Sequence, residues 1–297
     1  MNNSTESLPD ECLRLLNLEQ ALFSKEYRDF YAEGETKPEE VGSPYLLHNA
    51  QSKKGVLLIH GLMAAPEEVR EWAEYLYDAG YSVYAPRMAG HGTSSLDLSH
   101  RNKQEWVSSV SRGHDILKTF CETITIAGFS TGASVALQQV IRNPDAFDAI
   151  ISISAPLKLK SFSANFAGLL NTWNRFFSAI GLSAITKPYA SNHADNPHIN
   201  YLRCPINSVV QIQKLMKSVV VKLSGIKIPS LVIHGTGDPK VDVAGAREIF
   251  NRISSTNKTY KEIDANVHDI VRGEIAESVF EEVSVFLKNL ELTESNI

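Results

Sequence analysis

The sequence predicts an α/β protein with a mostly parallel central sheet, helices on both of its faces, and a cap subdomain inserted between two strands. Three observations predict this fold. Short apolar segments typical of strands alternate with segments that repeat apolar residues at helical spacing. Several strand segments are continuous apolar runs, as expected where both faces of a strand are covered. The alternation stops between residues 157 and 228, a stretch too long for a structureless loop in a compact domain.

The composition narrows the class of protein before any motif is considered. The 297 residues are 43% hydrophobic and 21% charged, which excludes a wholly disordered chain. The formal net charge is −5, so we expect no nucleic-acid partner. The opening MNNSTESLPDE has no secretory pattern, and no apolar run approaches the length of a transmembrane helix. Three widely spaced cysteines imply no disulfide framework, and we expect a cytoplasmic protein.

Residues 1–44 form an N-terminal helical extension. Apolar residues at helical spacing predict an amphipathic helix from Pro9 to about Tyr31: Leu13, Leu16, Leu22, Phe23, Tyr27 and Phe30. Gly34 ends this helix. Its apolar face must be buried, either on its own domain or on a second subunit, which leaves a homodimer open.

The predicted core comprises residues 45–156 and 229–297, on either side of the cap at 157–228. The expected strands lie at 45–48, 55–60, 81–86, 123–128, 149–155, 229–234 and 259–263. One helix is expected to begin at Pro66, and three others are expected to span 104–121, 131–142 and 243–253. A final helix is expected where apolar residues repeat at helical spacing from Ile275 onward. Within the cap, a helical pattern runs from Ile206 to Leu223.

A G-x-S-x-G motif provides the candidate nucleophile, Ser130. The motif runs from Gly128 to Gly132, after an apolar strand and before a helix that contains alanines. A sharp strand-to-helix turn would raise the Ser130 hydroxyl above the sheet, and the flanking glycines would let strand and helix pass closely. Isolated matches to this motif occur by chance, so the surrounding strand and helix carry the prediction.

Asp238 and His268 are the predicted partners of Ser130. Each follows a predicted strand, where open α/β sheets place their active sites, and the chain order is serine, aspartate, histidine. His268 would take the proton of Ser130, and Asp238 would orient the imidazole. Two other aspartates, Asp242 and Asp269, are alternatives to Asp238. Asp242 stands where a helix should start and is expected to be a cap, and Asp269 is expected to point away from His268.

Two backbone N–H groups are expected to form an oxyanion hole. One belongs to Thr131, directly after the nucleophile, and the other to Leu62, in the turn after the first long strand. His60 is expected to be structural. His193 and His198 flank Asp195 in the cap, but their spacing matches no strong ligand motif, so we expect no metal site.

Five sequence blocks carry a family resemblance: LLIHGL ending at Leu62, AGHG at 89–92, GFSTG at 128–132, GTGD ending at Asp238, and VH at 267–268. The chain resembles the bacterial carboxylesterases and monoacylglycerol lipases of the α/β-hydrolase fold over residues 45–290, in the same order. The resemblance implies a serine esterase that acts on a small-molecule carboxylic ester without a cofactor. The first 40 residues depart from the compact members of that family.

The cap is rich in aromatic residues, and some of them are expected to roof the site: Phe162, Phe166, Trp173, Phe176, Phe177, Tyr189 and Tyr201. We therefore expect a preference for short-to-medium acyl chains. Lysophospholipid hydrolysis, acyl transfer and cleavage of a carbon–carbon bond would use the same three residues. A non-catalytic binding protein of this fold is the alternative from another class.

Overall fold

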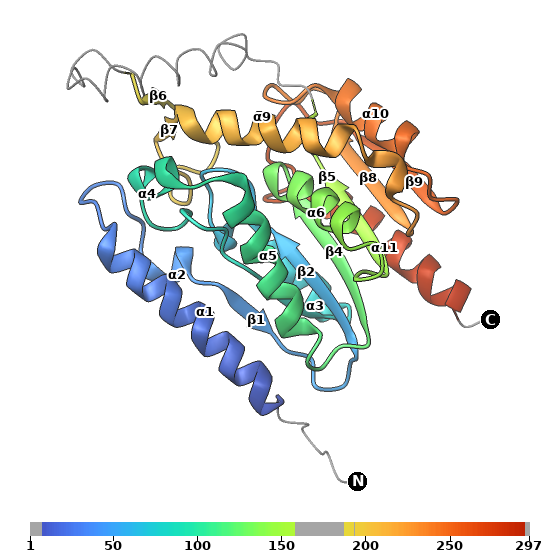
Figure 1. Cartoon of the computed structure of the whole chain (residues 1–297). Coiled ribbons are helices and arrows are strands. Elements are labelled where there is room, and N and C mark those ends of the chain that lie inside the picture. The colour runs from blue at the N-terminus through green and yellow to red at the C-terminus, as the bar shows by residue number, and fades with distance from the viewer. Residues whose placement is uncertain (1–7, 158–186, 193, 295–297) are drawn as a thin grey trace.

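The computed structural model describes residues 8–157, 187–192 and 194–294. Its centre is a seven-stranded sheet in the order β1-β3-β2-β4-β5-β8-β9 (Figure 1). The strands are β1 (Tyr45–Leu47), β2 (Lys54–Ile59), β3 (Ser82–Ala85), β4 (Thr123–Phe129), β5 (Ala149–Ile153), β8 (Ser230–Gly235) and β9 (Lys258–Ile263). Only β1 pairs antiparallel within this sheet, which confirms the mostly parallel sheet.

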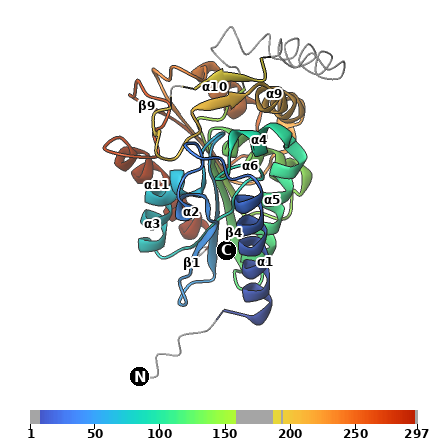
Figure 2. The same cartoon turned by 90° about the vertical axis from the view of Figure 1, so that its left-hand side faces the viewer.

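Helices cover both faces of the sheet, as predicted (Figure 2). On one face lie α3 (Arg70–Asp78) and α11 (Ala276–Glu294), and on the other α5 (Lys103–Leu117), α6 (Thr131–Arg142) and α10 (Val243–Arg252). Successive residues of a strand point to opposite faces, so Leu57 and Leu58 of β2 belong to different cores. Both side chains are fully buried, which explains the uninterrupted apolar run.

Short elements precede or interrupt the predicted ones. The helix expected at Pro66 begins as a 3-10 turn, η1 (Pro66–Val69), before α3 starts at Arg70. Two short helices that the apolar pattern did not indicate are α2 (Glu39–Gly42) and α4 (Ser95–His100). The side chain of Ser94 caps α4 by accepting a hydrogen bond from the backbone N–H of Asp97.

The predicted N-terminal helix is α1 (Asp10–Asp29), and it packs against α5 of its own chain. Phe23 is buried as expected, but Leu13 and Leu22 are exposed. Instead, two glutamates, Glu19 and Glu26, lie on the buried face. The apolar pattern therefore predicted the helix but only part of the face that it buries.

Arginines of the core explain these buried acids. Glu19 pairs with Arg112 of α5, at 2.5 Å between Oε1 and Nε. Glu26 pairs with Arg87 through one oxygen and with Arg101 through the other, the second pair at 2.9 Å. The side chain of Arg87 is only 4% exposed, so removing its partner would leave a buried charge uncompensated.

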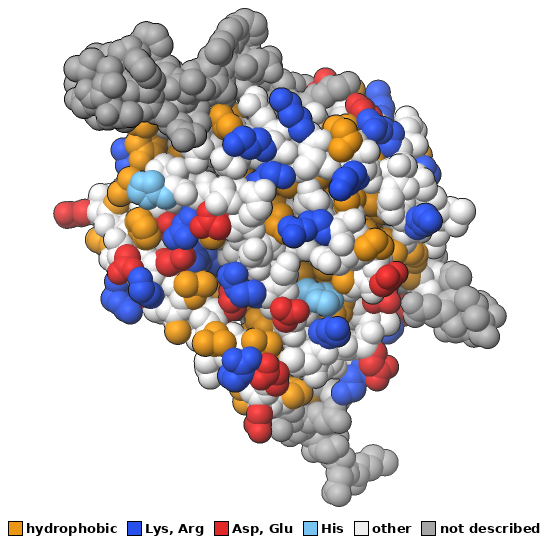
Figure 3. Space-filling view, in the orientation of Figure 1, with side chains coloured by type: hydrophobic (Ala, Val, Ile, Leu, Met, Phe, Trp, Pro, Cys, Tyr) orange, Lys and Arg blue, Asp and Glu red, His pale blue; other side chains and the backbone are white. Residues whose placement is uncertain are grey.

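The described part of the predicted cap lies above the carboxyl edge of the sheet. It contains an antiparallel pair, β6 (Tyr189–Ser191) and β7 (Arg203–Pro205), followed by α9 (Ile206–Val220) and η3 (Leu223–Gly225). The buried face of α9 is mostly apolar, while lysine and arginine side chains gather over its outer face (Figure 3). Residues 158–186, with five of the seven predicted cap aromatics, lie outside the described residues. Across the described ranges, no helix combines the length and apolarity needed to cross a bilayer.

We expect the exchange Glu26→Gln to lower the free energy of unfolding by about 3–5 kcal/mol, because it leaves Arg87 buried without its counter-charge. Urea titration followed by circular dichroism measures this loss. Glu33→Gln is the control, since Glu33 is exposed and the same exchange there should change stability by less than about 0.5 kcal/mol. Equal midpoints for the two variants would contradict the buried ion pair.

Candidate active site

Ser130 occupies the strained turn between β4 and α6. Its backbone has φ 52° and ψ −120°, a conformation that costs a non-glycine residue about 1–3 kcal/mol. Two glycines make this turn possible. A Cβ on Gly128 would lie 2.5 Å from the carbonyl carbon of Gly132, and a Cβ on Gly132 would collide with the carbonyl oxygens of Ile59 and His60. The N–H of Ser130 donates to the carbonyl of Ile153 at 2.8 Å, which fixes the turn against β5.

The structure brings Ser130, His268 and Asp238 together in one hydrogen-bonded chain. The Nε2 atom of His268 lies 2.9 Å from Oγ of Ser130, and its Nδ1 atom lies 2.7 Å from Oδ2 of Asp238. With the Nδ1 proton directed at the carboxylate, Nε2 is left to accept the proton of the serine. The three residues come from segments 138 and 30 residues apart, and each follows the end of a parallel strand.

Asp238 is held as an anion by its surroundings. Its burial alone would raise the pKa, but the hydrogen bond and charge of His268 outweigh burial and lower the pKa of Asp238 below its usual value. Its second oxygen, Oδ1, accepts the backbone N–H groups of Lys240 at 2.8 Å and Val241 at 3.0 Å. A fixed carboxylate suits the orientation and stabilisation of an imidazolium.

The two residues expected to supply oxyanion donors, Leu62 and Thr131, line the cavity together with Ser130. Thr131 is the first residue of α6, where backbone N–H groups have no acceptor within the helix. Leu62 lies in the turn after β2, and both residues line the same cavity as Ser130. The preceding N–H, that of Gly61, donates to the side chain of Glu68 at 2.5 Å.

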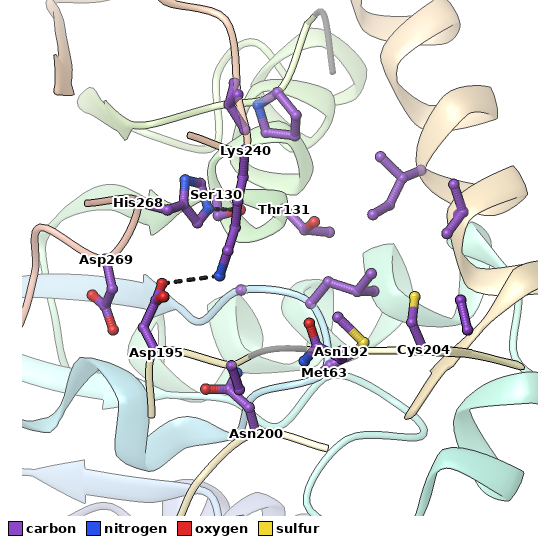
Figure 4. Close-up of a pocket in the computed structure, with 18 of the residues that line it drawn as sticks. Met63, Ser130, Thr131, Asn192, Asp195, Asn200, Cys204, Lys240, His268 and Asp269 are labelled. Atoms are coloured by element: carbon purple, nitrogen blue, oxygen red, sulfur yellow. Dashed lines mark hydrogen bonds and ion pairs between the residues drawn. The ribbon is translucent and has the colours of Figure 1, made fainter. Parts of the chain in front are cut away.

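The cavity above Ser130 has a volume of about 700 Å³ and two chemically distinct ends. Figure 4 shows Met63 and Cys204 on one side of Ser130, and Asp195 and Asp269 on the other. Asn192 lies beside Met63 on the first side (Figure 4), and the apolar lining residues of the cavity include Leu62 from the turn after β2 and Ile206, Val209 and Ile212 from α9. The second end is polar and is lined further by Asn196, Asn200 and Lys240 (Figure 4).

An ion pair spans the polar end of the cavity. The Nζ atom of Lys240 lies 2.9 Å from Oδ2 of Asp195 (Figure 4). Lys240 belongs to the segment after β8, and Asp195 to the loop between β6 and β7, so the pair joins the core to the cap region. Asp269 faces the same end, and Asn196 donates to its Oδ2 at 2.5 Å. Burial raises the pKa of Asp269.

The two alternative aspartates have different surroundings. Asp242 caps α10 by accepting the N–H of Ala244 at 2.9 Å, as predicted. Asp269 lines the cavity and bonds with Asn196, a role that its position after His268 did not suggest. Glu68, Asn196, Asn200 and Lys240 were not predicted to line the site, because nothing in their sequence spacing distinguishes them from surface residues.

Other predicted residues have simpler surroundings. His60 is buried and its Nε2 accepts the backbone N–H of Met88 at 3.2 Å. Tyr189 lines the cavity, whereas Tyr201 is buried away from it and donates to the carbonyl of Gly90 at 3.0 Å. His193 lies outside the described residues. Among the residues that the structure describes, no group of three or more histidine, cysteine or acidic side chains could hold a metal ion.

Known proteins resemble the chain across most of its length. The profile of the serine aminopeptidase S33 family matches residues 50–275. A thermostable monoacylglycerol lipase of Bacillus sp. (strain H-257) is 33% identical over 214 residues, 72% of this chain and 82% of that protein. A carboxylesterase of Bacillus subtilis (strain 168) is 26% identical over 239 residues, 80% of this chain and 94% of that protein. The crystal structure of a Paleococcus ferrophilus monoacylglycerol lipase has the same fold, with TM-score 0.69 and 21% identity over 82% of this chain and 97% of the other.

We expect Ser130→Ala, Asp238→Asn and His268→Ala each to lower kcat for p-nitrophenyl butyrate by about 10³-fold or more, because each removes one member of the hydrogen-bonded chain. Asp242→Asn is the matched control in the same segment. It alters only a helix cap, so its kcat should stay within about twofold of the unmodified protein. Near-normal hydrolysis by folded Ser130→Ala would contradict the assignment.

Proposed function

Because the chain belongs to the serine aminopeptidase S33 family, we propose that it is a serine hydrolase of carboxylic esters with Ser130 as nucleophile. The observation that carries the proposal is the chain of hydrogen bonds from Ser130 through His268 to Asp238, on the floor of a two-ended cavity. The relatives named monoacylglycerol lipase and carboxylesterase support an ester rather than a peptide as the substrate.

The proposed reaction has two steps. Ser130 attacks the ester carbonyl while His268 takes its proton, and His268 then gives that proton to the leaving alcohol. Water activated by His268 then hydrolyses the acyl-enzyme and regenerates Ser130. The N–H groups of Leu62 and Thr131 stabilise the negative charge that develops on the carbonyl oxygen in each step.

The two ends of the cavity support an orientation for the substrate. The apolar end, bounded by Leu62, Met63 and α9, suits an acyl chain, since each buried methylene contributes about 0.8 kcal/mol. The polar end offers amides and carboxylates that bond well with hydroxyl groups, which suits a hydroxyl-rich alcohol such as glycerol. A monoacylglycerol of short-to-medium chain length combines both features.

The charge of the polar end separates this proposal from lysophospholipid hydrolysis. Lys240 is already paired with Asp195, and Asp269 adds a further acidic group. A phosphate group at this end would therefore meet a lysine whose charge is already offset by Asp195. We also assign residues 157–228 to a cap, supported by the contribution of β6, β7 and α9 to the cavity wall.

We expect kcat/KM for 1-monoacylglycerols to rise by about fourfold per methylene from two carbons, then to fall once the apolar end is filled, before sixteen carbons. Lysophosphatidic acids of equal chain length and triacylglycerols should be at least tenfold poorer substrates. Aminoacyl p-nitroanilides test the peptidase alternative, and Ser130→Ala provides the background rate.

A variant tests which end takes the acyl chain. Val209→Trp would fill the apolar end, so activity on medium chains should fall while activity on acetyl and propionyl esters is retained. Val221→Trp is the matched control, because Val221 is 68% exposed and lies just beyond α9. A steady rise to the longest chain, or equal profiles for both variants, would contradict the proposed orientation.

A further inference from the structure

Glu68 is a buried acid that the hydrolytic reaction does not itself use. It lies in η1, and the residue is 4% exposed. Its Oε2 atom accepts the N–H of Gly61 at 2.5 Å. A Cβ added to Gly61 would lie 3.0 Å from Oε2 of Glu68 and 3.4 Å from Cβ of Ser130, so the acid and Ser130 both lie beside the Cα atom of Gly61. The carboxyl group therefore holds the turn through the N–H of Gly61.

Two hydrogen bonds fix the orientation of this turn. Glu68 holds the N–H of Gly61, and Nδ1 of His60 lies 2.9 Å from the carbonyl oxygen of Gly61. Because Nε2 of His60 accepts the N–H of Met88, Nδ1 carries the ring proton and donates it. Burial lowers the pKa of His60 to about 4, which keeps the ring neutral.

The planarity of the peptide bond transmits this orientation to Leu62. The carbonyl of Gly61 and the N–H of Leu62 belong to one trans peptide, in which the two groups point in opposite directions. Since His60 holds the carbonyl end and Glu68 holds the peptide before it, the direction of the Leu62 N–H is set. Oxyanion donors act through such preorganisation, because they need no rearrangement during the reaction.

The charges around Glu68 determine its protonation. Burial, followed by the nearby charge of Asp269, raises the pKa of Glu68, which is about 8 with all of the surrounding groups included. The N–H of Gly61, the cation of Arg272 and a hydrogen bond with Asn200 act in the opposite direction. Below about pH 8 the side chain is thus a neutral acid. Above that pH it is a carboxylate beside the turn that carries the Leu62 oxyanion donor. A negative charge there opposes the charge that develops on the substrate oxygen.

We propose that Glu68 is a positioning residue: it orients the Gly61–Leu62 turn for the oxyanion, and loss of its proton sets the upper pH limit of the reaction. This inference rests on the proposed ester hydrolysis. It is distinct from the reaction of Ser130, because Glu68 touches the loop and not the reacting atoms.

Three variants test the proposal with p-nitrophenyl butyrate between pH 6 and 10, with the rate of Ser130→Ala subtracted at each pH. Glu68→Gln keeps an acceptor for the Gly61 N–H and cannot ionise, so kcat at pH 7 should stay within about threefold while the fall above about pH 8 disappears. Glu68→Ala loses the acceptor, so kcat should fall about 10- to 100-fold with KM changed less than about threefold. Glu67→Gln, at the half-exposed neighbouring position, should match the unmodified protein at every pH.

Each outcome separates this inference from the proposed function. If the unmodified protein is no more active than Ser130→Ala, the ester hydrolysis itself is wrong. If activity depends on Ser130 but folded Glu68→Ala keeps its kcat, Glu68 does not position the turn. If Glu68→Gln keeps the same fall above pH 8, another group sets the alkaline limit. Should Glu68→Ala fail to fold, the pH profile of Glu68→Gln still decides the question.

Discussion

The close passage of α6 over the end of β2 is the constraint on which the site depends. Gly132 allows it, because any side chain there would collide with the carbonyl oxygens of Ile59 and His60. The contact brings the first N–H groups of α6 beside the turn that contains Leu62. It also holds Ser130 in a conformation that the residue would not adopt alone. A local packing requirement thus determines both the position of Ser130 and that of the two expected oxyanion donors.

The parallel sheet explains why distant segments can complete this arrangement. Parallel strands present all their carboxyl ends at one edge, so the segments after β2, β4, β8 and β9 converge there. The cap region then divides the space above Ser130 into an apolar and a polar end. In the proposed ester hydrolysis, the sheet would supply the chemistry and the cap region the selectivity, which is the usual division between a rigid scaffold and its connecting segments.

Much of the fold and of the candidate site was predictable from the sequence, because strong local signals mark the strands, the helices and the turn at Ser130. The helix after Ser130 was predicted at 131–142, and α6 has those bounds, since a glycine turn begins it and Asn143-Pro144 follow it. The buried face of α1 was less predictable, because Glu26 is compatible with burial only through Arg87 and Arg101, which follow it by 61 and 75 residues. The short strands β6 and β7, of three residues each, leave no recognisable alternation. Glu68 gives no signal either, since its burial follows from the turn that it supports.

The ion pairs of α1 have a consequence for how the chain is made. Its partners Arg87, Arg101 and Arg112 follow Glu19 and Glu26 by 61 to 93 residues, so α1 leaves the ribosome long before it can dock. At about 5–20 residues per second, the last of these arginines follows on the order of 5–20 s later. During that interval, the glutamates on its inner face interrupt the apolar surface of the nascent helix and reduce its tendency to associate with other chains. The glutamates that hold α1 in the folded protein through ion pairs would therefore also limit its association with other chains before it docks.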